Sequence, residues 1–303
     1  MSIFILGSYA KALVMTTERI PVAGETLIGQ DFRQTWGGKG SDMAVQAARL
    51  GACVRYAGVV GDDTFGNEFI QLMRQEGVNI DALTVTGEQP TGAGLIVKDR
   101  LARNIIVVDM GANKLFTPEL VDAARPGLET CRVALAQLEI PLETALYGLR
   151  LAHALGKATI LNPAPARDLR GCDLSAIDYL TPNETEARVA LGLAPDDPRS
   201  NREIADLLLN TGCRRVVMTL GDAGSAVYTR TETLEIAPCR IEVVDSNGAG
   251  DSFNAALAVA IAEGLPLGGA LRFANATAAL CCTAWETVPS YAVRRDVDAF
   301  LNA

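Results

Sequence analysis

Histidine and paired cysteines are nearly absent from this chain of 303 residues. Its seven cysteines are scattered and show no C-x-x-C spacing, which is typical of reduced thiols in the cytosol rather than of a disulfide framework. The single histidine, His153, falls in a helical pattern over residues 142–155, with no Cys or carboxylate placed to complete a ligand set. Histidine acid–base chemistry and a His-rich metal site are therefore disfavoured.

Long apolar runs and an excess of positive charge are absent as well. Lys and Arg total 27 against 36 Asp and Glu, a net charge of -9, which is the wrong sign for binding a nucleic-acid backbone. The richest apolar stretch, residues 255–262, ends at Glu263 and Gly264, well short of the roughly 18 residues that span a bilayer. The apolar start has no basic region before it and is interpreted as a first strand. We expect a cytoplasmic protein without nucleic-acid or membrane partners.

What the chain does contain is a regular alternation of short β-rich runs and helical patterns. Residues 54–60 precede a helical pattern at 65–76, and residues 133–138 precede the one at 142–155. Such alternation predicts a mainly parallel sheet with helices on both faces, a three-layer α/β/α sandwich. No linker or internal repeat interrupts it, so we expect one domain over residues 1–303.

Two segments, about residues 12–35 and 82–108, break this rhythm. Their alternating apolar and polar residues, punctuated by Gly and Pro, predict antiparallel strands of a small separate sheet. Such a sheet beside a pocket could act as a lid that excludes water from a transfer reaction. The alternative is a pair of ordinary edge hairpins, and the pattern is compatible with both.

The string DSNGAGDSF, residues 245–253, joins a strand-like segment at 241–244 to a helix that begins near Asp251. Small residues ahead of a helix let backbone N–H groups converge, and the helix dipole adds positive charge there. An Asp at this junction could accept a hydroxyl proton while the anion hole stabilises a transferred phosphoryl group. The alternative is a glycine-rich turn with Asp251 as an ordinary N-cap.

A second string, WGGKGSD at residues 36–42, opens a helix that continues to Leu50. It is not a phosphate-binding P-loop, because Gly40 follows Lys39 where Ser or Thr is needed. Paired glycines let a ligand approach the backbone, with Lys39 and Asp42 facing it, although a solvated lysine at a helix start is the alternative. The dinucleotide pattern G-x-G-x-x-G is also missing after residues 248–250, which disfavours an oxidoreductase.

A third string, TPNETEA at residues 181–187, follows a short strand-like run and begins a helix. Asn183 and Glu186 lie about one turn apart, so both can face one site at a strand's carboxyl end. Oxygen ligands there suit a hydrated Mg²⁺ that carries nucleotide phosphates. The same two residues also fit a capping box, which has no catalytic role.

Taken in order, the strings of this chain resemble those of the ribokinase-like (PfkB) carbohydrate kinase family. The resembling strings are GSYAK, GGKGSDMAVQAARLGA, GDDTFG, QLEIPLET, LNPAPA, TPNETEA, TLGDAG and DSNGAGDSFNAAL. The similarity is nearly continuous from residue 3 to residue 301. It implies an α/β sandwich with a β-sheet lid, ATP with Mg²⁺, transfer of the γ-phosphoryl group to a sugar hydroxyl, and a homodimer formed through the lid.

The resemblance also implies roles for single residues. Asp251 matches the catalytic base, and the anion hole falls on Gly248, Ala249 and Gly250. Sugar-contacting positions fall on Gly38, Lys39, Asp42, Glu139 and Asp251. Nucleotide and Mg²⁺ positions fall on Asn183, Glu186, Thr219, Gly221, Gly224 and Asn275. Asp245 and Asn247 match a loop that binds a monovalent cation, usually K⁺, but Glu286 stands where the family has glycine.

The sugar side departs from ribokinase at two further positions. GSYAKA aligns with a segment that carries Asn and then Asp for the sugar hydroxyls, and these positions are Ala10 and Ala12 here. Asp42 also replaces an Asn. We therefore expect a sugar kinase for a pentose or related small sugar that is not optimised for D-ribose. The alternatives are a nucleoside kinase of the same family and a non-catalytic sugar or nucleotide sensor on the same fold.

Overall fold

The computed structural model describes residues 1–100 and 103–302, and the strands in this part of the chain form two separate sheets. The large sheet contains, in spatial order, β13 (Thr233–Ile236), β12 (Ser225–Tyr228), β11 (Val216–Thr219), β10 (Tyr179–Leu180), β9 (Ala158–Leu161), β8 (Val133–Ala136), β1 (Ser2–Leu6), β4 (Cys53–Gly61) and β5 (Asn79–Thr86). Neighbours from β5 to β11 run parallel, and β12 is antiparallel to both of its neighbours. The predicted mainly parallel sheet is confirmed.

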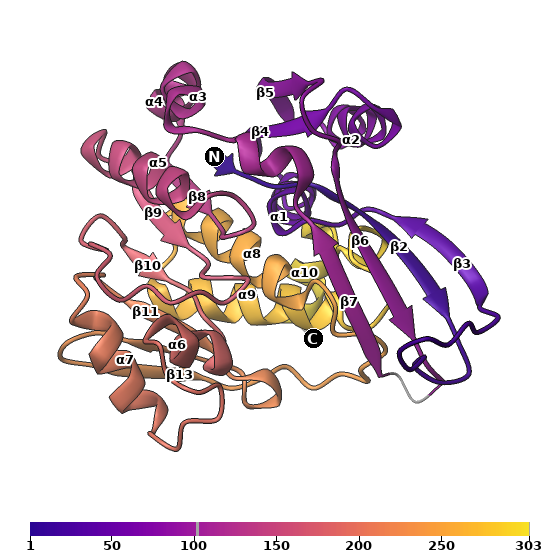
Figure 1. The fold of residues 1–303 in the computed structure, drawn as a ribbon. Coiled ribbons are helices and arrows are strands. Elements are labelled where there is room, and N and C mark those ends of the chain that lie inside the picture. Colours follow the sequence, from indigo (N-terminus) through magenta and orange to yellow (C-terminus); the bar gives the residue numbers. More distant parts are fainter. Residues whose placement is uncertain (101–102, 303) are drawn as a thin grey trace.

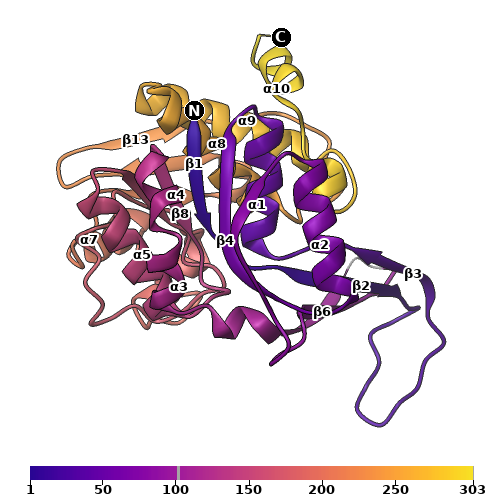
Figure 2. The same ribbon diagram turned by 90° about the horizontal axis from the view of Figure 1, so that it is seen from above.

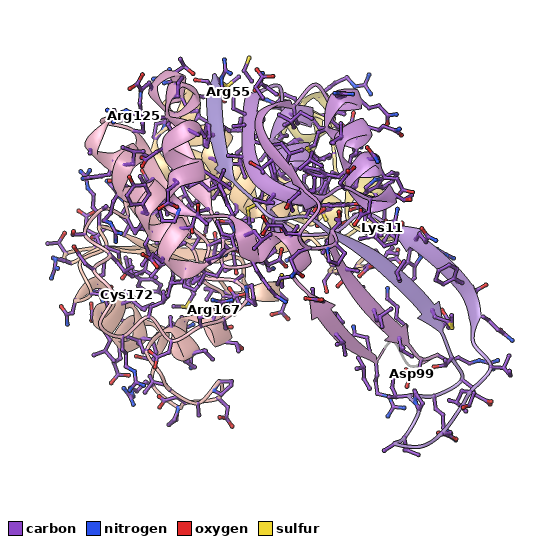
Figure 3. The ribbon with its side chains drawn as sticks, turned by 45° about the horizontal axis from the view of Figure 1, so that its top comes forward. Lys11, Arg55, Asp99, Arg125, Arg167 and Cys172 are labelled. Atoms are coloured by element: carbon purple, nitrogen blue, oxygen red, sulfur yellow. The ribbon has the colours of Figure 1, made fainter. Side chains whose placement is uncertain are left out.

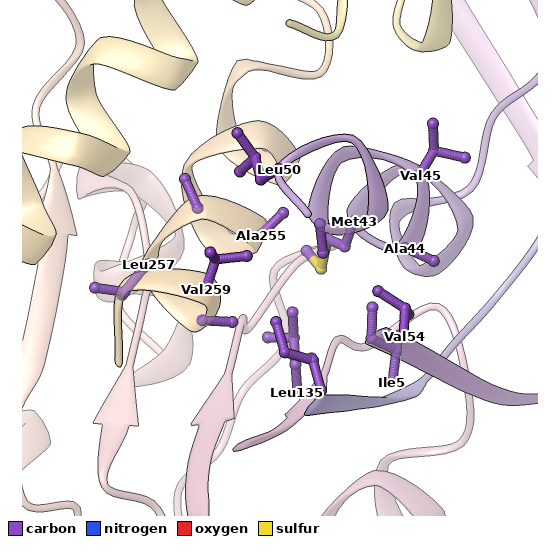
Figure 4. Packing of buried hydrophobic residues seen from close by; sticks show 14 of the residues in the cluster. Ile5, Met43, Ala44, Val45, Leu50, Val54, Leu135, Ala255, Leu257 and Val259 are labelled. Carbon is purple, nitrogen blue, oxygen red and sulfur yellow. The ribbon is translucent and has the colours of Figure 1, made fainter. Parts of the chain in front are cut away.

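Helices cover both faces of this sheet because its central strands are apolar on both sides. In β1, Ile3 and Ile5 pack into one core with α1, α8 and α9, whereas Phe4 and Leu6 pack into a second core with α5 and α7. Figure 4 shows part of the first core, and the layers are visible in Figure 1. The helices are α1 (Lys39–Arg49), α2 (Thr64–Gln75), α3 (Pro118–Ala123), α4 (Arg125–Thr130), α5 (Leu142–Ala154), α6 (Glu184–Ala190), α7 (Asn201–Leu209), α8 (Ala249–Glu263), α9 (Leu267–Cys281) and α10 (Arg294–Leu301). The three-layer sandwich is confirmed.

The small sheet projects from the body, and we call it the lid (Figures 1 and 2). Its strand order is β3 (Gln30–Thr35), β2 (Ala10–Thr16), β6 (Gly92–Lys98) and β7 (Asn104–Asp109). The expectation of antiparallel strands holds for the β2–β3 and β6–β7 pairs, but β2 and β6 run parallel. Residues 101–102 of the predicted lid segment lie outside the described residues.

Three sequence expectations need correction. Residues 82–86, predicted in the lid, belong to β5 at the edge of the large sheet, where Leu83 packs on the first core. An edge strand with one solvent-exposed face shows the same alternation of apolar and polar residues as a lid strand. Residues 241–244 form no strand, and the N–H of Val244 instead donates to Cys282 O at 2.8 Å. The helix after them begins at Ala249, two residues before Asp251.

Among the described residues, no helix is long and apolar enough to cross a membrane.

Candidate active site

A cavity of about 200 Å³ lies between the lid and the carboxyl ends of the central strands. Loops at this edge of a parallel sheet are the usual place for a ligand. The lining includes every position predicted to contact the acceptor: Ala10, Ala12, Gly38, Lys39, Asp42, Glu139 and Asp251. Figure 3 shows how the lid carries side chains away from the body, with Lys11 at its base and Asp99 toward its far end. The tertiary structure thus gathers residues from four distant strings at one cavity.

The first turn of α8 forms one end of this cavity. Gly248 precedes the helix with a φ of 78°, and a Cβ there would lie 2.8 Å from the hydroxyl oxygen of Tyr291. Glycine therefore meets both a conformational and a steric requirement at this position. The N–H groups of the first helical turn have no acceptor within the helix, and the helix dipole favours an anion beside them. The three positions predicted for the anion hole, Gly248, Ala249 and Gly250, lie at this helix start, where the N–H of Ala249 donates to Ser246 O at 3.3 Å.

Asp251 lies in the same turn and is almost completely buried, with 7% of its surface exposed. Among the described residues, its Oδ1 has no hydrogen-bond partner, and Lys39 Nζ is 3.9 Å away. Burial raises the pKa of Asp251 to about 6; Lys39 opposes this rise, whereas Glu139 and Glu186 add to it. A carboxylate with this pKa is ionised at neutral pH and still basic enough to accept a proton from a hydroxyl.

The helix α1 presents Lys39 and Asp42 because its start packs tightly against residues 7–8, which follow β1. A Cβ at Gly40 would overlap the backbone of residues 7–8, so the absence of a side chain permits this contact. The charge of Asp251 is the main cause that raises the pKa of Lys39, which therefore stays protonated. Asp42 is fully buried, and burial, reinforced by the charges of Asp251 and Glu139, raises its pKa well above the usual range.

Ser8 is a site residue to which sequence reasoning assigned no role. Its Oγ donates to Glu139 Oε2 at 2.6 Å and accepts from the N–H of Gly40 at 3.2 Å and from Gln137 Nε2 at 2.7 Å. Glu139 Oε2 also accepts from the N–H of Lys39 at 2.7 Å. Ser8 follows β1 and Glu139 follows β8, and these paired strands end side by side. Its position directly after a central strand was the available sequence signal.

The predicted nucleotide side begins at α6. Asn183 Oδ1 accepts from the N–H of Glu186, and Glu186 Oε2 accepts from the N–H of Asn183, both at 2.8 Å. The capping box proposed as the alternative is therefore present. Burial raises the pKa of Glu186, and the nearby charge of Lys39 opposes this. The cap thus holds Glu186 within the electrostatic reach of the cavity, so the two interpretations of this string are compatible.

A metal site built from protein ligands alone is not present in the part of the chain that the structure describes, where no group of three or more His, Cys, Asp or Glu residues could hold an ion. A single carboxylate beside the predicted phosphate positions instead suits Mg²⁺, which keeps several waters and travels with nucleotide phosphates. Glu186 fits that role.

The remaining nucleotide positions meet beside β11 and β13. Thr219 bridges to Asn183, and Gly221 follows with a φ of 58°. Gly224, with a φ of 93°, leaves no room for a Cβ against Ile236 O. Asn275 Nδ2 donates to Ile236 O at 3.4 Å and to Ala237 O at 3.3 Å. These positions lie outside the acceptor cavity, and the structure brings them together as a second group.

The predicted K⁺ loop does not fit a free cation well. Asp245 Oδ1 accepts from the N–H of Asn247 at 3.0 Å, and Oδ2 accepts from the N–H of Glu286 at 3.3 Å. Glu286 has a φ of 70°, the left-handed region that favours the family's glycine. Lys98 Nζ of the lid lies 3.9 Å from Asp245 Oδ2. The carboxylate therefore already has an ammonium group beside it.

Together, this fold and this site define a small-molecule kinase. A sequence model of the family described as pfkB family carbohydrate kinase matches residues 2–292, and the chain belongs to this family. It is 36% identical over 301 residues to a ribokinase of Mus musculus, covering 98% of this chain and 93% of the relative. It is 32% identical over 305 residues to a deoxyribokinase of Salmonella typhi, covering 100% and 99%. A ribokinase structure from Thermotoga maritima superposes with a TM-score of 0.90 at 29% identity, covering 100% of both chains. The resemblance stated from the sequence motifs is confirmed.

Proposed function

We propose that this carbohydrate kinase transfers the γ-phosphoryl group of ATP to a hydroxyl of a pentose or related small sugar. The observation that carries the proposal is Oδ1 of Asp251 at the start of α8, which faces the cavity and accepts no hydrogen bond from the described residues. Asp251 accepts the proton of the acceptor hydroxyl, and the N–H groups of residues 248–250 stabilise the negative charge on the transferred phosphoryl group. The ammonium of Lys39, beside Asp251, offsets part of the negative charge at this site. A ribokinase of Arabidopsis thaliana, 28% identical with a TM-score of 0.89, was solved in complex with ribose and ATP.

ATP would be held by the second group of residues. These are Asn183, Thr219, Gly221, Gly224 and Asn275. Mg²⁺, oriented through waters by Glu186, would offset phosphate charge when bound.

The acceptor side favours a sugar other than D-ribose. Ala10 and Ala12 line the cavity, and Val14, Ile96 and Ile106 continue an apolar wall along the lid. Ribose hydroxyls against this wall would be buried without partners. A deoxy carbon or an apolar substituent fits it better, and the carboxyl of Asp42 lies at the opposite, helix side.

At the level of the whole molecule, we propose one kinase domain over residues 1–303 that acts in the cytoplasm as a homodimer joined through the lid. The outer face of the lid supports the dimer, since Leu95 is 57% and Val107 is 62% exposed. Apolar side chains of this size are usually covered when several lie together.

The test is a coupled assay of ADP release with pentoses, ketohexoses, deoxy sugars, amino sugars and nucleosides as acceptors. We expect turnover with at least one sugar and a lower kcat/KM for D-ribose than for the best acceptor. ADP release with none of them would favour the non-catalytic sensor, and turnover confined to nucleosides would favour the nucleoside kinase.

A further inference from the structure

Two lid strands bring cationic side chains to the segments that flank the anion hole. Lys98, the last residue of β6, lies 3.9 Å from Asp245 Oδ2, and its Nζ is 5.6 Å from the ring centroid of Trp285. Arg33 of β3 lies 3.5 Å from Glu286 Oε1. In Figure 1 the orange segment between β13 and α8, which contains Asp245, runs toward the lid. The Lys98 contact joins the lid to the loop that leads into Gly248, and the Arg33 contact joins it to the segment that follows α9.

Asp245 shapes that loop. Its Oδ1 accepts from the N–H of Asn247, immediately before Gly248, and its Oδ2 accepts from the N–H of Glu286. Only 9% of its side chain is exposed, so water screens its charge poorly. An unpaired carboxylate three residues before the anion hole would oppose a phosphate group arriving there. A fixed positive charge next to Asp245 removes this repulsion.

Lys98 can supply this fixed positive charge, because its ammonium is partly buried and held beside an aromatic ring. Its ammonium has three donors, and its side chain is 23% exposed, which reduces its contact with water. The Trp285 ring lies within the distance at which a cation is attracted to an aromatic face. A K⁺ ion near Asp245 Oδ2 would stand next to this ammonium and be repelled by it.

We infer that Lys98 supplies, from within the chain, the cation that the loop of residues 245–248 needs, so that phosphoryl transfer does not depend on K⁺. Lys98 acts as a positioning residue through Asp245, and this role rests on the proposed kinase function. Lys98 belongs to the lid and also lines the acceptor cavity, and its contact with Asp245 is present with the lid over that cavity. The same contact therefore couples closure of the lid to completion of the anion hole.

The test compares wild type, Lys98→Met and Lys98→Arg in tetramethylammonium chloride and in KCl at equal ionic strength. Wild type and Lys98→Arg should have the same kcat in both salts. Lys98→Met should lose about tenfold in kcat without K⁺, as expected for losing one electrostatic contribution near a transferred group, and regain most of it in KCl. Arg33→Met, which removes the ion pair between the lid and Glu286 but leaves the Lys98–Asp245 contact, is the control and should show no response to K⁺.

K⁺ activation of the wild type would overturn the inference. So would a Lys98→Met variant whose only defect is a raised KM for the acceptor, because Lys98 would then be an acceptor contact. A second measurement needs no turnover: KCl should raise the melting temperature of Lys98→Met relative to tetramethylammonium chloride and leave that of wild type unchanged. If the wild type phosphorylates no acceptor, the proposed function fails, and the melting temperatures still decide the role of Lys98.

Discussion

At the scale of single residues, two opposing effects set the pKa of Asp251. Burial raises its pKa to about 6, and the ammonium of Lys39 limits the rise. The protonated carboxyl cannot accept a proton, so kcat/KM should fall as the pH drops below about 6. Lys39→Met should move this acidic limb to higher pH, because the opposing charge is gone. A pH–rate profile of both proteins checks this, and an unchanged limb in the variant would contradict the coupling.

Replacing the base itself separates chemistry from binding. Asp251→Asn should lower kcat by about 10²–10⁴ while ATP affinity, measured by titration calorimetry, stays within a few-fold of wild type. The amide keeps the size of the side chain but accepts no proton. A variant with wild-type kcat on the best acceptor would remove Asp251 from the mechanism.

Glu186 can be tested without disturbing its helix, because Gln also accepts hydrogen bonds in a capping box. Glu186→Gln should raise the Mg²⁺ concentration at half-maximal rate, since a neutral amide orients metal-bound waters less strongly than a carboxylate. Glu203→Gln is the matched control, because Glu203 forms the equivalent capping box with Ser200 at the start of α7. Coincident Mg²⁺ titrations for wild type and Glu186→Gln would exclude the metal role.

At the scale of the elements, strand β2 of the lid decides which acceptor fits. A carboxylate at position 12 could accept charge-assisted hydrogen bonds from sugar hydroxyls, each worth about 1.5–3 kcal/mol. Ala12→Asp should therefore raise kcat/KM for D-ribose by about tenfold or more and lower it for the best native acceptor. Ala93→Asp, on the neighbouring strand β6 but outside the cavity lining, is the control. Efficient use of ribose by the unmodified protein would show that other groups replace the missing carboxylate.

At the scale of the whole molecule, the lid is the proposed dimer contact. Sedimentation velocity should show a dimer for wild type and a monomer for Leu95→Asp/Val107→Asp, because two carboxylates would be desolvated in an apolar interface. Leu207→Asp changes a side chain of α7 that is 38% exposed and distant in sequence from the lid, and it should remain dimeric. A dimeric double variant would place the contact elsewhere.

The sequence by itself predicted the layers of the fold and a set of residues that the structure gathers at one cavity. The apolar strands and their alternation with helices are local signals, and they sufficed for the parallel sheet and its two cores. The glycine-rich strings marked the start of α1 and α8, because only glycine permits the backbone approaches seen at Gly40 and Gly248. The resemblance to a family then predicted the chemistry of Asp251 and its neighbours, which remains a proposal.

Other features were decided only by the tertiary structure. An exposed edge strand and a lid strand have the same pattern, so the place of β5 depended on its pairing with β4. Ser8 forms hydrogen bonds to several site residues because β1 and β8 end side by side. Lys98 lies beside Asp245, far away in the sequence, because the lid folds over the cavity. Hydrogen bonds and charge pairs depend on distance in space, and a sequence pattern reports only distance along the chain.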